Sequence, residues 1–369
     1  MHIVIDARKL GDFGIGSYIQ GLGAACSQLA PEHTFTFLGP AAAQSLPRPL
    51  RGANVRWRQN RSKNYSLTEL VSISRQVRRI GADVFHAPHY IFPLMLPCPG
   101  VVTIHDCIHL RFPEQLPNRA ALFYARYMLR RAVRQASCVI TGSEATRSDL
   151  VELVGADPAK IEAISYGCDP IFFQTIGSDV LAATRSEMRV EAPFLLYAGN
   201  VKPHKNLDRL LRAFAQLAPD YPDLHLLLVG GDLDGHPSLQ RTYQQLGLEQ
   251  RIRFLGRLPR TRLHALYQLA DVFVFPSLYE GFGLPPLEAM ASGTPVVAAR
   301  SSSLPEIIGD AGVLVDPYEI DAIAAGIRRL LDDAELRRTL AAGGRQRAQR
   351  FSWRRAGRKV LQIYSRVAG

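Results

Sequence analysis

Two distant segments of this sequence repeat one local pattern, in which a short apolar run leads through a glycine-containing loop into an apolar-periodic segment. The first has the apolar run HIVIDA and the loop GDFGIGSY, and its periodic segment ends near Leu29. The second has the apolar run FLLYA and the loop GNVKPHKNL, and its periodic segment includes LLRAF. A strand, a loop and a helix in this order form the repeating unit of α/β sheets, and the loop commonly binds phosphate. The pattern therefore predicts an α/β chain with a ligand-facing loop in each half.

The length of the chain favours two domains. At 369 residues it exceeds what one hydrophobic core usually fills, so domains of about 150 to 200 residues are expected. Periodicity is poor from Pro170 to about Pro193, which predicts the interdomain linker there. We therefore expect a first domain over residues 1–172 and a second over residues 190–350.

The charge balance points to anionic partners. The chain has 44 Lys and Arg against 33 Asp and Glu, a formal net charge of +11. Nucleic acid, an anionic membrane surface and phosphorylated substrates all fit this charge. The basic residues are scattered among several segments without a known nucleic-acid-binding motif, so we expect no nucleic-acid partner.

The cysteines and the N-terminus predict a cytoplasmic protein. The five cysteines form no CxxC pair and are odd in number, which is typical of buried free thiols in a reducing compartment. The N-terminal MHIVIDARKL has no basic and apolar pattern of a secretion signal. Apolar runs are far shorter than the roughly 20 residues that span a bilayer, so we expect any membrane contact to be peripheral, at the inner face of the cell membrane.

Two carboxylates flank a Gly/Pro turn in the segment from Phe275 to Ala298. Glu280 lies in the predicted loop, and Glu288 lies in the first turns of a predicted helix that ends before Gly293. The free N–H groups of such a helix start favour a phosphate or a sugar oxygen between the two acids. An ordinary loop acid and a helix-dipole partner are the alternative interpretation, and a pocket for a polyhydroxylated anion is the functional one.

The whole string around these acids resembles the E-x7-E signature of retaining glycosyltransferases of family 4. The segments FPS, EGFGLP, LEAMA and GTPVVA all match that signature. The resemblance implies an α/β fold of the GT-B type, with two Rossmann-like domains that face each other across a cleft. It also implies that the tail over residues 351–369, FSWRRAGRKVLQIYSRV and the two residues after it, crosses back as a helix onto the first domain.

The resemblance assigns a donor site to the second half of the chain. Lys205 precedes a predicted helix that begins near Asn206, so a cation and a helix N-terminus converge on one anion, as at the family's pyrophosphate site. Many relatives have arginines where this chain has Asn200 and His204, and Lys202 or Arg209 is left as the second cation. The implied donor-binding residues are Gly14, Gly16, Asn200, Lys205, Arg209, Phe254, Arg257, Glu280, Gly281, Phe282, Gly283, Leu284 and Glu288.

In the first half, Gly14 and Gly16 give a GxG spacing without a third glycine. A tight turn explains this spacing as well as a ligand does, and only the resemblance turns the two glycines into donor contacts. His105 follows the strand predicted at Val101–Ile104, and the resemblance places it beside the donor sugar with a catalytic role shared by Lys205 and Glu280. A metal site made of His86, His89, His105 and His109 is not expected, because their spacing on loops does not match a zinc pattern.

Residues 117–136 predict a basic amphipathic helix. Arg126, Arg130 and Arg134 recur every four residues, and Phe123, Tyr127 and Leu129 offer apolar anchors. Docking on anionic lipid or on a phosphorylated acceptor is one interpretation, and a solvated helix face is the other. The preceding apolar loop HYIFPLMLPCPG is either a buried plug or an apolar lip for a lipid-linked acceptor.

The resemblance implies an enzyme that moves a hexose from a nucleotide diphosphate sugar to a hydroxyl of a glycan or a lipid-linked acceptor, with retention at the anomeric carbon. The resemblance makes mannose from GDP-mannose the first choice, in bacterial polysaccharide or glycolipid synthesis, with no metal and no cofactor besides the sugar nucleotide. A sugar-nucleotide epimerase of the same architecture is the main alternative. A dehydrogenase is disfavoured by the missing third glycine, and a non-enzymatic anion or nucleic-acid binder is the third alternative.

Overall fold

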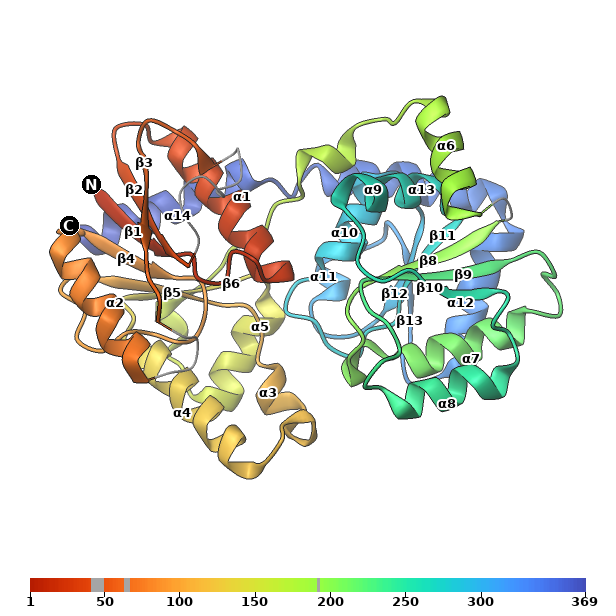
Figure 1. The fold of residues 1–369 in the computed structure, drawn as a ribbon, viewed down its shortest axis with the longest axis horizontal. Helices are drawn as coiled ribbons and strands as arrows, with labels where there is room; N and C mark the ends of the chain where they lie inside the picture. Colours follow the sequence, from red (N-terminus) through yellow and green to blue (C-terminus); the bar gives the residue numbers. More distant parts are fainter. Residues whose placement is uncertain (41–49, 63–66, 191–192) are drawn as a thin grey trace. The chain divides into compact units, whose positions relative to one another are not determined.

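The computed structural model describes residues 1–40, 50–62, 67–190 and 193–369, which form two compact units (Figure 1). Unit 1 comprises Met1–Gly167 and Phe351–Gly369, and unit 2 comprises Cys168–Arg350. The segment expected to be a linker belongs to unit 2 instead, and it contains the helix α6 (Ser178–Met188). The helix has little hydrophobic periodicity in its sequence because it lies at the surface, with Thr184 as its only buried residue.

Unit 1 is built on a seven-stranded parallel sheet in the order β3-β2-β1-β4-β5-β6-β7. Its strands are β1 (His2–Asp6), β2 (Thr34–Gly39), β3 (Val55–Gln59), β4 (Val84–Ala87), β5 (Gly100–Ile104), β6 (Cys138–Thr141) and β7 (Ile161–Ala163). In the register of β1, Ile3 lies opposite Phe35 of β2 on one side and Val84 of β4 on the other. The strands β4, β5 and β6 are buried along their whole length, as expected when helices cover both faces of a parallel sheet.

The helices of unit 1 are α1 (Phe13–Leu29), α2 (Leu67–Ile80), α3 (Ile108–Arg111), α4 (Arg119–Gln135), α5 (Glu144–Asp149) and α14 (Trp353–Ala368). The last helix packs against the first, and Gly21 allows the contact, since a Cβ there would come within 2.2 Å of the indole ring of Trp353. The prediction that the C-terminal helix returns to the first domain is thereby confirmed.

Unit 2 is built on a six-stranded parallel sheet in the order β10-β9-β8-β11-β12-β13. Its strands are β8 (Phe194–Ala198), β9 (His225–Val229), β10 (Ile252–Phe254), β11 (Val272–Phe275), β12 (Val296–Ala299) and β13 (Val313–Val315). Its helices after α6 are α7 (Leu207–Leu217), α8 (Pro237–Leu246), α9 (Arg260–Leu269), α10 (Leu284–Ala291), α11 (Leu304–Ile308), α12 (Ile320–Asp332) and α13 (Ala334–Ala348).

Both sheets have a strand order that reverses direction at one place. In unit 1 the chain moves outward from β1 to β3 and then returns to the other side of β1 with β4. In unit 2 it moves outward from β8 to β10 and returns with β11. Ligands of such sheets bind beyond the carboxyl ends of the strands at this switch point, because the connecting helices diverge there. The two places to search for a site are therefore the edges beyond β1 and β4 and beyond β8 and β11.

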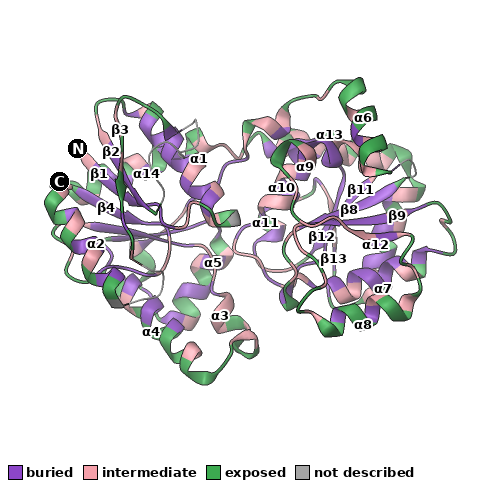
Figure 2. Cartoon of the chain, in the orientation of Figure 1, coloured by how far each residue is buried: buried purple, intermediate pink, exposed green. Residues whose placement is uncertain are grey.

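The cores consist of the sheet strands and the inward faces of the helices (Figure 2). All five cysteines lie in the described ranges and are free thiols. Cys98 is half-buried, and the other four are buried. Over the described residues, no helix combines the length and the apolar character needed to cross a membrane.

Candidate functional site

An ion pair occupies the switch point of unit 2. Nζ of Lys205, in the loop after β8, lies 2.6 Å from Oε1 of Glu280, in the loop after β11. Both side chains are largely buried, with 14% and 13% of their areas exposed. Nζ of Lys205 also lies 5.5 Å from the ring centroid of Phe275, a distance at which a cation is attracted to an aromatic face. The two residues that the sequence singled out separately are thus in direct contact.

The two loops that carry this pair are tied together by side-chain-to-backbone hydrogen bonds. Asn206 adopts the left-handed conformation with φ of 62°, and its amide donates to the carbonyl oxygens of Pro276 and Pro317. Ser277 donates to the carbonyl oxygen of His204. Asn tolerates this conformation better than most residues, so the turn before α7 is compatible with its sequence. The backbone around Lys205 is therefore held in place independently of its ion pair.

Serine residues after β12 hold the loop of Glu280. The hydroxyl of Ser302 accepts from the backbone N–H of Glu280 at 2.8 Å and contacts its carbonyl oxygen at 3.0 Å. Ser303 donates to the same carbonyl oxygen and also lies 2.7 Å from the carbonyl oxygen of Phe282. This role of the SSS run was not predicted from the sequence. Its position after a strand, at the carboxyl edge of the sheet, was the available signal.

Glu288 has a separate environment from Glu280. It lies in α10, and its Oε2 accepts a hydrogen bond of 3.3 Å from the hydroxyl of Tyr267. Burial raises the pKa of Glu288 to about 7, against the influence of nearby Arg260 and of the Tyr267 hydroxyl. Arg260 is itself paired with Asp169. The carboxyl group of Glu288 is thus poised between its two charge states near neutral pH.

The turn between the two acids contains four further predicted donor residues, Gly281, Phe282, Gly283 and Leu284. Gly283 precedes α10 with φ of 116°, a conformation that only glycine adopts readily, and Leu284 begins the helix. Phe282 is buried, whereas Gly281 and Leu284 are half-buried. The backbone N–H groups at this helix start favour a negatively charged oxygen.

The other predicted donor residues of unit 2 lie at the same carboxyl edge but differ in exposure. Asn200 is exposed, and its carbonyl oxygen accepts from the hydroxyl of Tyr197. Arg209 is committed to other partners, because it donates to Asn206 and to the carbonyl oxygen of Tyr318. Phe254 is the last residue of β10, and Arg257 lies in the loop after this strand.

These last two residues differ from each other in their packing. Phe254 is half-buried and packs edge-on against Tyr243, with ring centroids 5.7 Å apart. Arg257 is exposed, directly after Gly256, whose carbonyl oxygen accepts from the backbone N–H of Gly230. The loops after β9 and β10 are therefore joined at the edge of the sheet.

In unit 1, the glycines of the first loop lie in a helix. The helix α1 begins at Phe13, inside the predicted loop, so Gly14 and Gly16 belong to its first turn. A Cβ at Gly16 would lie 2.3 Å from the carbonyl oxygen of Leu10, so the packing of this loop by itself requires a glycine there. Among the residues that the structure describes, no atom outside the neighbouring helix backbone lies within 4 Å of the corresponding position at Gly14.

His105 follows β5 as predicted, and both of its ring nitrogens are engaged within unit 1. Nε2 lies 2.9 Å from the carbonyl oxygen of Pro88, so it must be the donor of that bond, and Nδ1 accepts from the hydroxyl of Tyr166 at 2.7 Å. Burial lowers the pKa of His105, which keeps the ring neutral. The ring would contact a substrate through a nitrogen only if it exchanged one of these bonds.

The other histidines of the metal site that the sequence disfavoured are His86, His89 and His109. His86 is buried and hydrogen-bonded to Tyr364 and Thr103, and His89 accepts from the backbone N–H of Ile91. Over the residues that the structure covers, no three His, Cys, Asp or Glu side chains are grouped so as to hold a metal ion.

The basic helix of unit 1 is α4, and Arg126, Arg130 and Arg134 are all exposed on it. Phe123 and Tyr127 are 68% and 64% exposed. Leu129, expected to be an apolar anchor, is instead buried in the core of the unit. A helix presents opposite faces to core and solvent, and position 129 falls on the same face as Ala125 and Ala132.

The apolar loop before β5 is buried in its first part and exposed further along. Ile91 and Phe92 are buried, whereas Leu94 and Met95 are 38% and 81% exposed. Arg131 of α4 donates to the carbonyl oxygens of Phe92 and Pro93, so this loop is attached to the basic helix.

Comparison with known proteins identifies two matching sequence families. Residues 183–347 match the family described as glycosyl transferases group 1, and residues 14–171 match glycosyltransferase family 4. The chain is 31% identical over 282 residues to the O-antigen chain mannosyltransferase B of Escherichia coli, a match that covers 76% of this chain and 74% of that protein.

A second relative is the D-inositol 3-phosphate glycosyltransferase of Corynebacterium efficiens, 34% identical over 266 residues. That match covers 69% of this chain and 62% of the relative, so less than two thirds of the relative's length is represented. Among solved structures, the Anabaena protein HepE in complex with UDP and glucose is similar, with a TM-score of 0.79, 24% identity and 99% of both chains covered. This likeness shows the GT-B fold that the sequence predicted, and the two matching families show that the chain belongs to the group 1 glycosyltransferases of family 4.

Proposed function

We propose that this glycosyltransferase moves a hexose from a nucleotide diphosphate sugar, with GDP-mannose as the first choice, to a hydroxyl of a glycan or a lipid-linked acceptor. The observation that carries the proposal is the ion pair between Lys205 and Glu280 at the switch point of unit 2. It places a cation and a hydroxyl-binding carboxylate side by side where ligands of such sheets collect. The mannosyl choice is supported by the name of the E. coli relative.

Lys205 is proposed to bind the leaving group, which is the nucleoside diphosphate. Breaking the anomeric bond builds negative charge on the diphosphate, and Lys205 together with the starts of α7 and α10 stabilises this charge without a metal. Because Arg209 donates to Asn206 and Tyr318, the exposed Lys202 is our choice for the second cation.

Glu280 and Glu288 are proposed to bind the sugar and the nucleoside. In the bound state Glu280 exchanges its contact with Lys205 for hydroxyls of the transferred sugar, and Glu288 accepts from the ribose hydroxyls. Both acids are thus donor-orienting groups. We propose same-face attack of the acceptor on the donor, with retention, because neither acid is assigned as a covalent nucleophile.

We also propose that unit 1 contacts an anionic membrane surface from its basic helix. The exposed rings of Phe123 and Tyr127 and the side chain of Met95 can enter the headgroup region while the exposed arginines Arg126, Arg130 and Arg134 pair with lipid phosphates. This arrangement fits a lipid-linked acceptor and a site of action at the inner face of the cell membrane.

A thermal-shift screen against a panel of nucleotide sugars tests the donor assignment. GDP-mannose is expected to raise the melting temperature most. In an activity assay with GDP-mannose, GDP should be released only when an acceptor is present. Release of GDP-linked epimer without an acceptor would support an epimerase instead. If no nucleotide sugar shifts the melting temperature, the proposed function is wrong.

A further inference from the structure

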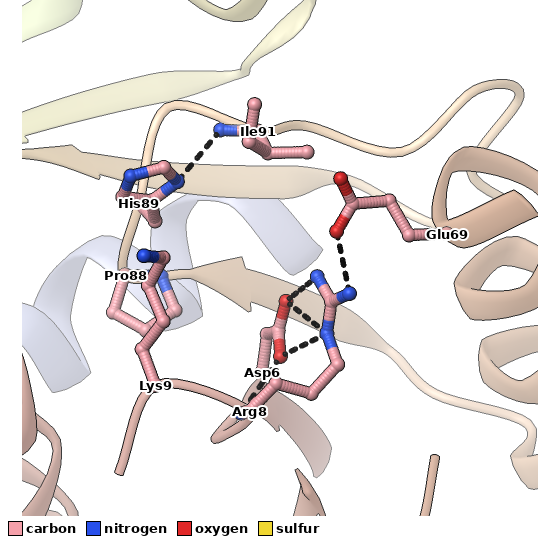
Figure 3. A pocket seen from close by; sticks show the side chains of 7 residues that line it. All are labelled: Asp6, Arg8, Lys9, Glu69, Pro88, His89 and Ile91. Carbon is pink, nitrogen blue, oxygen red and sulfur yellow. Dashed lines mark hydrogen bonds and ion pairs between the residues drawn. The ribbon is translucent and has the colours of Figure 1, made fainter. Parts of the chain in front are cut away.

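A polar pocket occupies the switch point of unit 1, at the place that corresponds to the Lys205–Glu280 pair of unit 2. It is lined by the last residue of β1 and the residues after it, by residues in the loop after β4, and by the first turn of α2 (Figure 3). Strand order alone predicts a ligand here, because the chain reverses direction between these two strands. His89 and Ile91 belong to the loop that the sequence offered as an apolar lip for an acceptor, and His89 was also considered as a metal ligand. The other lining residues were not singled out from the sequence.

The centre of the pocket is an arginine held by two carboxylates. Arg8 donates from Nε and Nη2 to Asp6, at 3.0 and 2.7 Å, and from Nη1 to Glu69 at 2.5 Å (Figure 3). The side chains of Arg8, Asp6 and Glu69 are 5%, 10% and 1% exposed. Burying three charges is costly, and apolar residues of similar volume would usually serve stability as well. The position of the cluster at the ligand edge therefore points to binding.

The charges of the pocket balance without a ligand. Asp6 and Glu69 offset Arg8 and Lys9, and Nζ of Lys9 lies 3.1 Å from Oδ2 of Asp12. Burial, with the nearby positive charges of Lys9 and Arg8, holds the pKa of His89 well below its usual range, so this ring adds no positive charge. A phosphate group entering the pocket would meet cations that already have carboxylate partners, and it would be repelled by the carboxylates themselves.

A neutral hydroxyl has no such conflict. It donates to a carboxylate oxygen and accepts from a guanidinium or ammonium N–H, and the side chains of Pro88 and Ile91 offer apolar contacts to the C–H groups of a sugar. The enclosed part of the pocket is small and has room for a hydroxyl or hydroxymethyl group rather than a whole ring. We propose that this pocket binds a hydroxyl-bearing group of a neutral acceptor sugar and discriminates against a phosphate at that position. The inference rests on the proposed function, since it assigns the acceptor of the same reaction.

The test compares D-mannose with D-mannose 6-phosphate, which differ in one hydroxymethyl group, by calorimetric titration of the whole chain at low ionic strength. The neutral sugar is expected to bind at least about tenfold more tightly, because of repulsion by the two carboxylates. Equal or tighter binding of the phosphorylated sugar would overturn the inference. Failure of both sugars to bind would overturn it too.

Two variants assign the discrimination to this pocket. Glu69→Gln removes a negative charge with little change of shape and should narrow the preference for the neutral sugar, whereas Lys9→Gln removes a positive charge and should widen it. Arg79→Gln, an exposed charge change on α2, is the matched control and should leave the preference unchanged. If Glu69→Gln does not fold, the half-buried Lys9 still provides a test of opposite sign. If neither variant changes the ratio of the affinities for mannose and mannose 6-phosphate, this pocket is not where the two sugars are discriminated.

Failure of this inference is distinguishable from failure of the proposed function. The nucleotide-sugar screen reports on unit 2, and it does not depend on the charges around Arg8. If a nucleotide sugar binds but the two mannose ligands are not discriminated, only the acceptor assignment is wrong. If no nucleotide sugar binds, the donor assignment is wrong.

Discussion

Nζ of Lys205 and Oε1 of Glu280 lie 2.6 Å apart although 75 residues separate them in the chain. A parallel sheet produces this contact, because β8 and β11 are hydrogen-bonded neighbours and their carboxyl ends meet at one edge. The pair satisfies two charges that would otherwise be costly to bury. Under the proposed function, donor binding would exchange these partners, with phosphate contacting the lysine and sugar hydroxyls contacting the glutamate.

Replacing the lysine should remove most of the activity. Lys205→Gln is expected to lower kcat/KM for transfer by about 10²- to 10³-fold, as for loss of one preorganised group that stabilises developing negative charge. The measurement is steady-state transfer with GDP-mannose, with circular dichroism to confirm folding. Lys359→Gln, an exposed lysine of α14, is the matched control. Activity within about twofold of the original protein in Lys205→Gln would contradict the phosphate role.

Replacing the glutamate should separate nucleotide binding from transfer. Glu280→Gln leaves Lys205 without its carboxylate, so this cation attracts a diphosphate more strongly, and GDP should bind at least as tightly as before. Transfer should nevertheless slow by about tenfold or more, because a carboxylate that accepts from sugar hydroxyls is lost. Calorimetry with GDP and initial rates with GDP-mannose give the two quantities. Parallel losses in both would show that Glu280 serves the phosphate side of the site instead.

The raised pKa of Glu288 predicts a pH dependence of stability. The ordinary pKa is 4.5 and the folded value is about 7, so the folded state holds its proton over this range while the unfolded state releases it. The contribution of this group is fully present below pH 4.5 and is lost as the pH rises to about 7, by at most about 3 kcal/mol. Urea unfolding at several pH values should show this loss in the original protein.

Glu288→Gln provides the reference for this effect, since its side chain does not titrate. The difference in free energy of unfolding between the original protein and the variant should fall from pH 5 to pH 7.5. A difference that stays constant over this range would show that Glu288 is ionised throughout.

Binding to vesicles should depend on the basic helix of unit 1. Exchange of Arg126, Arg130 and Arg134 for Gln should weaken binding to vesicles with anionic lipid by about 10²-fold, at roughly 1 kcal/mol for each arginine near the surface. Exchange of Arg75, Arg78 and Arg79, three exposed arginines of α2, is the control with the same loss of charge. Flotation that is equal for both triple variants would assign the binding to net charge alone.

The Tyr166–His105 hydrogen bond should help to keep the pKa of His105 low without affecting nucleotide binding. Tyr166→Phe removes the donor to Nδ1 and frees this nitrogen to take a proton, so the pKa of His105 should rise toward its usual range. NMR titration of the ring protons measures the pKa, and GDP binding to unit 2 should be unchanged. An unchanged pKa would mean that burial alone keeps the ring neutral.

The local sequence determined most of the strands and helices. The strand β8 coincides with the apolar run FLLYA, and β5 extends the strand predicted at Val101–Ile104 by one residue, because buried parallel strands are short apolar runs. It also singled out Lys205 and Glu280, since the family signature around them is local. The α6 helix was missed because its surface-lying residues give little hydrophobic periodicity.

Only the tertiary structure decided which of these residues meet. Glu280 pairs with Lys205 whereas Glu288 contacts Tyr267, although both acids belong to one local motif. Arg8 is joined to Glu69 across 61 residues of sequence. Such pairings depend on the order of the strands, which the crossover connections set, and no local pattern of residues records that order. The local sequence thus determined the family and most of the residues at the ligand edge of unit 2, whereas the sheet topology decided their geometry and brought Arg8 and Glu69 together in unit 1.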